Sequence, residues 1–443
     1  MKKIVIILLL LLVAIGLVNA QVPQGRVEIE FWFALRGPLG DATMNLVNDF
    51  NSSQDKYWVN AFYKGTYPEV MAAAIAAFRA GKAPHIVQIF EVGTATMMAS
   101  EGAIYPIYQL FKDTGVSLNP QNYISAVKDY YSFPDGRMAA MPFNSSTAVM
   151  WYNKDAFRKA GLDPNKPPKT WDEVRKASRQ IVKTGAAKIG LSASWLPWTQ
   201  FEQLGAIHNV PFATRWNGFM GLDARLTLNH PLYVRHLQNL IEMQKEGSFT
   251  YGGRDAQPDG LFPSGEAAML IASSALYGRV SKEAQFDWGI TYLPYYDDVP
   301  KAPWNSIIGG AALWVMRRPD ATLTHYKAVA EFLRFLSLPK NDAWWHMTTG
   351  YLPVTLEGYK YAKDQGYYKK NPGLDIPILQ LTRTKPTPNT KGLRLGNLPS
   401  IRIVIYEEVE KALQGQQTAK DALNNIVLRG NAILREFEAI YKK

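Results

Sequence analysis

A small polar segment that directly precedes an apolar one is the first feature of this sequence that could do chemistry. Asn144, Ser145, Ser146 and Thr147 stand immediately before the apolar run at residues 148–152. Hydroxyl and amide side chains at such a junction can complete the hydrogen bonds of a turn, attack a substrate, or hold a ligand. The rest of the sequence has to decide between these three roles.

Known catalytic patterns are nearly absent. The six histidines form no His-x-x-x-His pair and no HExxH motif, which argues against a zinc hydrolase; they are His85, His208, His230, His236, His325 and His346. The sequence also contains no GxxxxGK[ST], GxGxxG or GxSxG motif. We therefore expect no catalytic residues, no metal site and no cofactor.

One pattern resembles penicillin-recognising enzymes. Ser125 and Lys128 form an SxxK motif, and residues 183–185 read KTG. The third motif of those enzymes, SxN, occurs only at residues 117–119, before the SxxK and thus out of order. Because the KTG also falls where a helix is expected to end, we do not favour this interpretation.

Several residues that suit a binding site stand at the ends of predicted elements. Glu91 follows the apolar run at residues 85–90, at the carboxyl edge where open α/β sheets hold ligands. Trp195 and Trp198 are three residues apart, so they would face one way on a helix, among small polar residues that suit a cleft wall. Taken singly, Glu91 could be a surface carboxylate and each tryptophan could be part of the core.

Three more candidates lie in the second half of the chain. Ser273 follows the apolar run at residues 267–271, and Tyr351 lies in an expected turn at residues 350–353. Arg402 flanks an apolar helical stripe just after a proline, where a solvent-exposed helix residue is the ordinary alternative.

The elements that must position these residues follow an alternating order. Residues 27–33, 57–63 and 85–90 read as strands, and residues 39–50 and the stripe of Met71, Ile75 and Phe78 read as helices, the latter ended by Gly81. Strand and helix alternation predicts an α/β fold with a parallel sheet.

Later segments agree with this fold class. Thr170 and Glu173 form a capping box that opens a helix running toward Gly185, and residues 307–316 read as a strand interrupted by glycines. One face of a long terminal helix carries Leu423, Ile426, Gly430, Ile433 and Phe437.

The start of the chain and its composition indicate export. Lys2 and Lys3 precede an apolar run at residues 4–18 and a small-residue exit at residues 18–20, which is typical of a signal peptide cleaved after Ala20; the alternative is an uncleaved anchor. With no cysteine in the chain, the fold must be held by its core, and 443 residues suggest two or more domains. The formal net charge of +11 is scattered without a basic run, which argues against nucleic acid and leaves a small anionic ligand open.

Long segments carry a resemblance to a known family. They include YKGTY at residue 63, IAAFRAGKAP at 75, EVGTATMMAS at 91, PFNSSTAV at 142, YNKDAFRKAGLDP at 152, IIGGAALWVM at 307, TGYLPVT at 349 and KGLRLGN at 391. Across nearly the whole mature sequence, the chain resembles the extracellular solute-binding proteins of ABC importers, and among them those that bind glycerol phosphates.

This resemblance implies a periplasmic binding protein-like fold of two α/β lobes with mainly parallel sheets, joined by crossing strands, with the ligand in the cleft. Lobe one would comprise residues 21–143 and 294–340, and lobe two residues 144–293 and 341–443. The first crossing would lie at residues 139–152 and the return near residues 286–295. The segment Asn144 to Thr147 would then contribute a ligand donor rather than a nucleophile.

The family's ligand positions map onto a defined set of residues, which are Tyr67, Glu91, Ser146, Ser273, Gly310, Tyr351 and Arg402, with Trp195 and Trp198 as the cleft tryptophans. As the single cation of the set, Arg402 would take the phosphate with help from serine hydroxyls and the Gly310 amide. Glu91 would accept hydroxyl groups at the glycerol end. Relatives often read Phe-Trp-His at the first strand, whereas this chain has Phe33 in place of the histidine, which leaves that part of the cleft in doubt.

The function that follows is capture of sn-glycerol-3-phosphate, glycerophosphodiesters or both in the periplasm by a monomer, and delivery to an inner-membrane ABC permease with its cytoplasmic ATPase. Two alternatives stay open. An oligosaccharide-binding protein of the same fold would suit the aromatic content, and a periplasmic glycerophosphodiester-processing enzyme would act on the same ligands. The sequence does not choose among the glycerophosphates.

Overall fold

One mixed sheet runs through the molecule. The computed structural model describes residues 22–100 and 102–442, so the expected signal peptide lies outside the described residues. The sheet has eight strands in the order β2-β1-β3-β8-β4-β6-β5, with β7 paired to β4. The strands are β1 (Val27–Phe33), β2 (Tyr57–Tyr63), β3 (Ile86–Phe90), β4 (Met141–Asn153), β5 (Ile189–Ala193), β6 (Ala267–Ser273), β7 (Trp288–Thr291) and β8 (Ile308–Val315).

Strand β4 is the element that joins the two halves of the sheet. Residues 141–147 pair antiparallel with β8, which in turn pairs with β3, whereas residues 148–153 pair antiparallel with β6 and β7. Away from this centre, β1 pairs parallel with both β2 and β3, and β5 pairs parallel with β6. The expected α/β fold class and the first crossing strand are therefore confirmed. The strand that comes back beside β4 is β8, which follows the expected return segment.

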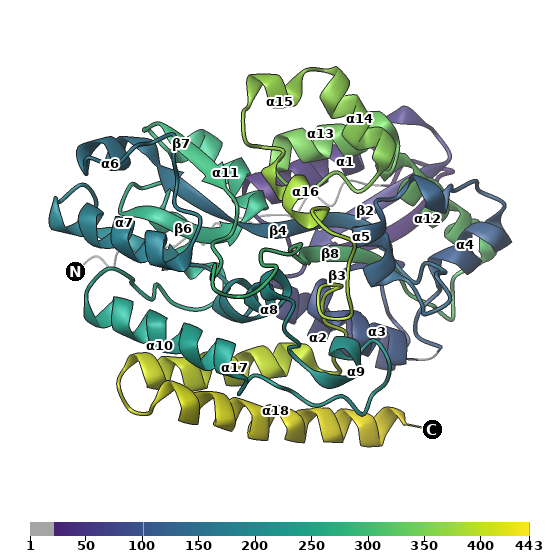
Figure 1. Ribbon diagram of the computed structural model, residues 1–443. Helices are drawn as coiled ribbons and strands as arrows, with labels where there is room; N and C mark the ends of the chain where they lie inside the picture. The colour runs from purple at the N-terminus through teal and green to yellow at the C-terminus, as the bar shows by residue number, and fades with distance from the viewer. Residues whose placement is uncertain (1–21, 101, 443) are drawn as a thin grey trace, which may run out of the picture.

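Helices cover both faces of the sheet (Figure 1). They are α1 (Pro38–Ser53), α2 (Tyr67–Arg79), α3 (Thr94–Ala99), α4 (Ile107–Thr114), α5 (Ser125–Lys128), α6 (Lys154–Lys159), α7 (Trp171–Lys183), α8 (Gln203–His208), α9 (Thr214–Asn217), α10 (Pro231–Lys245), α11 (Tyr277–Glu283), α12 (Leu323–Leu336), α13 (Pro339–Thr349), α14 (Leu356–Asp364), α15 (Tyr367–Lys370), α16 (Ile376–Leu381), α17 (Leu398–Leu413) and α18 (Ala419–Tyr441). Along the lower edge of Figure 1, α17 and α18 lie side by side next to α10. None of the helices in the described part of the chain is long and apolar enough to cross a membrane.

Local sequence signals explain where these helices begin and end. Helix α7 opens on the expected capping box, in which the Thr170 hydroxyl accepts from the Glu173 amide and the Glu173 carboxylate accepts from the Thr170 amide. Gly81 follows α2 in the left-handed conformation expected of a helix stop. The penicillin-recognition pattern is spread over unrelated elements, because Ser125 to Lys128 is the short helix α5 and Lys183 ends α7.

Two helix faces differ from the predicted ones. On α2, Met71 is buried but Phe78 is 37% exposed, and Val70 and Ala74 complete the buried face instead. On α18, Leu434 rather than Ile433 is fully buried. In both helices the buried face is shifted by about one residue from the predicted one. Apolar residues at intervals of three and four define a broad stripe, and the spacing alone does not tell which edge of that stripe faces the core.

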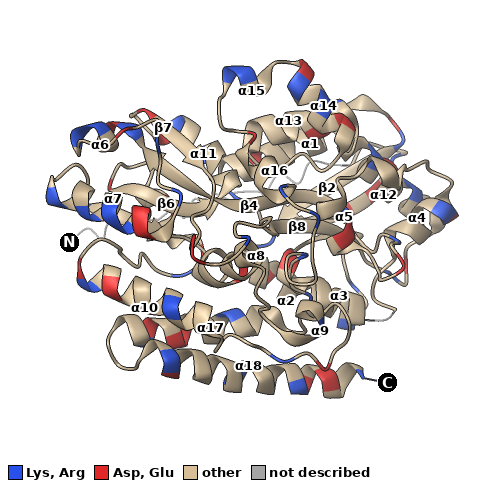
Figure 2. Cartoon of the chain, in the orientation of Figure 1, with Lys and Arg blue, Asp and Glu red and all other residues tan. Residues whose placement is uncertain are grey.

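Charges of both signs are interspersed over the molecule (Figure 2). Several exposed lysines and arginines pair with nearby acids, as Arg158 does with Asp155 and Asp287, and Arg235 with Asp298. The excess of positive charge is therefore spread out, as the scattered Lys and Arg of the sequence indicated.

Gly310 is the backbone position on which the junction of the two half-sheets depends. It has a φ of +86° inside β8 and pairs with Ser145, next to an irregularity in the β4 register between Pro142 and Asn144. A Cβ at Gly310 would lie 1.9 Å from the Asn144 carbonyl oxygen. A side chain there meets backbone, which cannot move without breaking the strand pairing.

We expect Gly310→Ala to lower the free energy of unfolding by at least about 3 kcal/mol, because it combines a left-handed backbone with a backbone clash. The matched control is Gly185→Ala, which has a φ of +64° but nothing within 4 Å of the added Cβ. That control should cost only about 1 to 2 kcal/mol. Urea unfolding of both variants measures the difference, and equal losses would contradict the steric argument.

Candidate functional site

A buried arginine held by two carboxylates is the centre of the site. Arg402 lies in the second turn of α17, Glu91 opens the short helix η1 (Glu91–Gly93) directly after β3, and Glu202 ends the π-helix η4 (Pro197–Glu202). The Nη2 of Arg402 donates to Oε1 of Glu91 at 2.7 Å. Its Nε and Nη2 donate to the two carboxylate oxygens of Glu202 at 2.7 and 2.8 Å. The three side chains are 9%, 7% and 2% exposed, in the order Arg402, Glu91 and Glu202.

Electrostatics keep this triad together. Burial raises the pKa of the Glu91 carboxyl, and the Arg402 charge acts against that rise. Burial alone lowers the pKa of Arg402, but the charges of Glu202 and Glu91 raise it above its ordinary value. With all three groups ionised, one positive charge faces two negative ones. The triad therefore offers a strong, oriented donor rather than a free positive charge.

This contact differs from the roles expected from the sequence. Arg402 and Glu91 were expected at opposite ends of a ligand, but the two side chains touch and must act at the same point. Glu202 was missed altogether. The signal that could have found it is its position four residues after Trp198, as the single acid in an otherwise uncharged stretch.

Neutral hydroxyls and an amide form a second group beside the triad. The Asn144 Nδ2 donates to the Tyr67 hydroxyl at 2.8 Å, and its Oδ1 accepts from Gln88 Nε2 at 2.8 Å. The Tyr67 ring stacks on Phe90, and the Tyr351 ring stacks on Trp345. Burial raises the pKa of both Tyr67 and Tyr351, whose hydroxyls lie close enough to shift each other, so both remain neutral donors.

The serines and Gly310 lie where the strands meet. Ser145 pairs with Gly310 and Ser146 with Gly309 across β4 and β8. Ser273 is the last residue of β6, and its hydroxyl accepts a hydrogen bond from the Ala275 amide at 3.2 Å. The hydroxyls of Ser145 and of Ser274, beside Ser273, are buried without a hydrogen-bond partner among the described residues. Buried polar groups are usually paired, but several other buried groups elsewhere in the described chain are also without a partner, so these two hydroxyls alone do not mark the site.

The two tryptophans are arranged differently from the prediction. Trp198 is buried within η4 and packs on β8, where a Cβ on Gly309 would lie 2.5 Å from the indole. Trp195 precedes the helix with a φ of +50° and is half-buried. Trp195 is therefore not helical, so the condition under which the two rings would face one way is not met.

The structure brings the expected residues together at one junction of the sheet. Glu91 contacts Arg402 and acts on the pKa of Tyr67 and Tyr351. Ser146, Gly310 and Trp198 meet through the pairing of β4 with β8, and Ser273 extends this group because β6 pairs with β4 at Ala148. These contacts join segments that the sequence placed in different lobes.

Two further residues, Asp259 and Phe33, bear on the extent of the site. Asp259, which the sequence did not single out, lies near Tyr351, and burial raises its pKa to about 6. Phe33, noted as a departure from relatives, is buried and packs on Phe31 and Tyr63 with ring centroids 5.6 and 6.1 Å away. Its local role is core packing. Within residues 22–100 and 102–442, no group of three His, Asp or Glu side chains could hold a metal ion.

Comparison with known proteins agrees with this architecture. Residues 45–375 match the model of the bacterial extracellular solute-binding protein family. The chain is 46% identical over 427 residues to the sn-glycerol-3-phosphate-binding periplasmic protein of Pectobacterium atrosepticum, covering 96% of this chain and 95% of that protein. It is 44% identical over 426 residues to the protein of the same name from Escherichia coli O1:K1, covering 96% of each.

A solved structure shows the same fold. The crystal structure of UgpB from Mycobacterium tuberculosis in complex with glycerophosphocholine aligns with a TM-score of 0.78 at 24% sequence identity, over 93% of this chain and 99% of that one. At that identity the likeness supports the fold alone, while the family match and the periplasmic relatives identify the sequence itself. By sequence, and in agreement with its fold, this chain belongs to the bacterial extracellular solute-binding proteins.

Proposed function

We propose that this protein is the periplasmic substrate-binding component of an ABC importer, which captures sn-glycerol-3-phosphate, glycerophosphodiesters or both. The observation that carries the proposal is the buried Arg402 triad, which lies near the buried hydroxyls of Tyr67 and Tyr351 and the ring of Tyr67 that stacks on Phe90. The names of relatives that are 44% and 46% identical over almost the whole chain point to the same ligands.

The ligand would be bound in two parts. Arg402 uses its Nε and Nη2 on the two carboxylates, so its Nη1 and the remaining carboxylate lone pairs are left, in the described part of the chain, for vicinal hydroxyls of a glycerol group. The phosphate would lie toward Tyr67, Ser146, Ser273, Tyr351 and the Gly310 amide, away from the two carboxylates. Trp195 and Trp198 would cover the carbon chain and exclude water.

The lobes keep the boundaries given above, with residues 21–143 and 294–340 in one and 144–293 and 341–443 in the other. Tyr67, Glu91 and Gly310 then lie in lobe one, and Ser273, Tyr351 and Arg402 in lobe two. After cleavage at Ala20, the mature monomer would deliver its ligand in the periplasm to the permease and its ATPase. It would not turn its ligand over.

An oligosaccharide is the second candidate ligand, because stacked tyrosines and buried tryptophans also suit sugar rings. The triad could hold the vicinal hydroxyls of either ligand, and what favours a glycerophosphate is the names of the relatives that are 44% and 46% identical over almost the whole chain. A competition experiment with both classes of ligand decides between the two candidates.

Native mass spectrometry of the protein purified from its own periplasm should reveal a bound glycerophosphate or glycerophosphodiester. Glycerophosphocholine should compete with it and maltose should not, because only the former carries both a phosphate and a glycerol diol. After long incubation, the displaced ligand should be recovered chemically unchanged. Product formation above that of Arg402→Ala would show an enzyme instead.

Arg402→Ala should weaken binding of glycerophosphocholine by roughly 100-fold, since it removes a largely desolvated, charge-assisted donor. Lys391→Ala is the control, because Lys391 is exposed and a surface cation contributes little. Arg402→Lys keeps the charge but loses the fork that spans both carboxylates, so it should recover only part of the affinity. Calorimetry measures all three, with thermal melting to verify folding, and unchanged affinity in Arg402→Ala would refute the assignment.

Ligand binding should close the two lobes. The pair Glu91 with Arg402 joins segments assigned to different lobes, so a ligand that contacts both favours the closed state. Small-angle X-ray scattering should show a smaller radius of gyration at saturating glycerophosphocholine. An identical profile with binding confirmed by calorimetry would contradict the lobe assignment.

A further inference from the structure

Helix α17 presents three residues at intervals of four on one face, namely Arg402, Tyr406 and Glu410. The first belongs to the site. The other two contact the segment at residues 251–257, which lies between α10 and β6 and is named here the 251–257 segment. This segment also contacts Trp195, which the proposed function assigns to the ligand. This face of α17 therefore carries Arg402 and also contacts the segment that holds Trp195.

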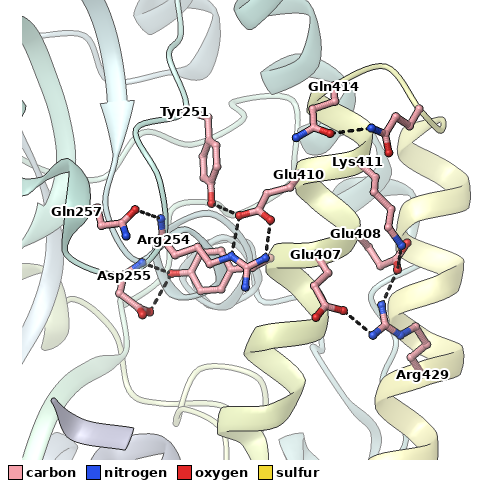
Figure 3. A network of polar contacts seen from close by, with 12 residues as sticks. Tyr251, Arg254, Asp255, Gln257, Glu407, Glu408, Glu410, Lys411, Gln414 and Arg429 are labelled. Atoms are coloured by element: carbon pink, nitrogen blue, oxygen red, sulfur yellow. Dashed lines mark hydrogen bonds and ion pairs between the residues drawn. The ribbon is translucent and has the colours of Figure 1, made fainter. Parts of the chain in front are cut away.

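Glu410 fixes the 251–257 segment by a bidentate contact. Arg254 donates from Nε and Nη2 to the two oxygens of Glu410 at 2.8 and 2.5 Å, and the Tyr251 hydroxyl donates to the same carboxylate at 2.7 Å. Figure 3 shows Tyr251 and Arg254 converging on Glu410. The hydrogen bonds from Arg254 lower the pKa of Glu410, which therefore stays ionised. A planar, doubly bonded pair restricts orientation as well as distance.

Tyr406 fixes the next residue of the segment. Its buried hydroxyl accepts from the Asp255 amide at 2.8 Å and donates to the Asp255 carboxylate at 3.3 Å. Burial raises the pKa of Tyr406, so the hydroxyl keeps the proton that it needs in order to donate. Asp255 itself has a φ of +48°, which a non-glycine residue rarely adopts.

Asp255 in turn holds the backbone of Trp195. The Trp195 amide donates to the Asp255 carbonyl at 2.8 Å, and Trp195 has a φ of +50°. Two hydrogen-bonded residues, both in the left-handed region, persist only where their surroundings over-determine them. The contacts from α17 to the 251–257 segment constrain these two residues in that conformation. A chain of direct contacts therefore runs from Glu410 and Tyr406 through Arg254 and Asp255 to Trp195.

We propose that Tyr406 and Glu410 are positioning residues, which fix the position of Trp195 relative to Arg402. One helix, α17, then positions both of these residues at the ligand site. The proposal rests on the proposed function for the identity of the ligand. Other polar contacts of α17 have a different role. Glu407 pairs with Arg429 of α18 on another side of the helix, so it fastens α17 to α18 without contacting the 251–257 segment (Figure 3).

The first test observes Trp195 directly and needs no ligand. In protein labelled with 5-fluorotryptophan, the ¹⁹F resonance of Trp195 is identified by its absence in Trp195→Phe. Tyr406→Phe, which removes only the hydroxyl, should shift or broaden that resonance. Glu407→Gln on the same helix should leave it in place. An unmoved Trp195 resonance in Tyr406→Phe would overturn the proposal. If Tyr406→Phe does not fold, Glu410→Gln serves in the same comparison.

The second test measures glycerophosphocholine affinity in a double-mutant cycle. Tyr406→Phe removes both hydrogen bonds to Asp255 and should weaken binding about fivefold to tenfold, because only part of their free energy is transmitted through Trp195. In a Trp195→Phe background the same substitution should have almost no further effect. Additive losses would show that Tyr406 affects binding independently of Trp195 and would overturn the positioning role. If the wild type binds neither glycerophosphocholine nor sn-glycerol-3-phosphate, the proposed function fails, while the ¹⁹F comparison still decides the positioning of Trp195.

Discussion

Burial of the Arg402 charge is the constraint on which the site depends. An isolated buried guanidinium is very unfavourable, and it becomes tolerable only when well-oriented acceptors surround it. Here Glu202 and Glu91 provide them from two different segments, at 2.7 to 2.8 Å. The ends of β3, η4 and α17 must therefore meet at one point. Removing Arg402 would leave two carboxylates buried side by side without a positive partner.

The sheet is built so that this meeting can occur. Strand β4 is long enough to pair with β8 over one half and with β6 and β7 over the other. Its central residues carry the hydroxyls and the amide of the site, so binding groups lie where the two halves are joined. Gly310 permits the close passage of β8 against Asn144. Its conformational freedom thus serves the junction itself, in addition to any approach of a ligand.

A triad of one positive and two negative groups has consequences for recognition. Such a triad would suit partners that both donate and accept hydrogen bonds, as vicinal hydroxyls do, because its positive charge is already paired by carboxylates of the described chain. Neutral donors from tyrosine, serine and backbone then suit the anionic part of a ligand without a second buried cation. Specificity would come from the division of the ligand between these two groups.

The sequence by itself determined the elements whose signals are local, although it placed the buried faces of α2 and α18 about one residue away from the real ones. The bounds of β1 and β2, the capping box of α7, the stop at Gly81 and the α/β class all follow from residues within a few positions of each other. Long segments such as PFNSSTAV and IIGGAALWVM also identified the family. Local signals of this kind predict correctly because they depend only on the geometry of one helix or strand.

Only the tertiary structure decided the chemistry of the site. Glu202 and Glu91 are 200 and 311 residues away from Arg402, so no periodicity or spacing could pair them or reveal that Arg402 is shared by two carboxylates. The left-handed backbone of Trp195 likewise depends on the 251–257 segment and on α17. The physical reason is that buried charges and strained backbones are satisfied by whichever groups the fold brings near, and those groups come from distant parts of the chain.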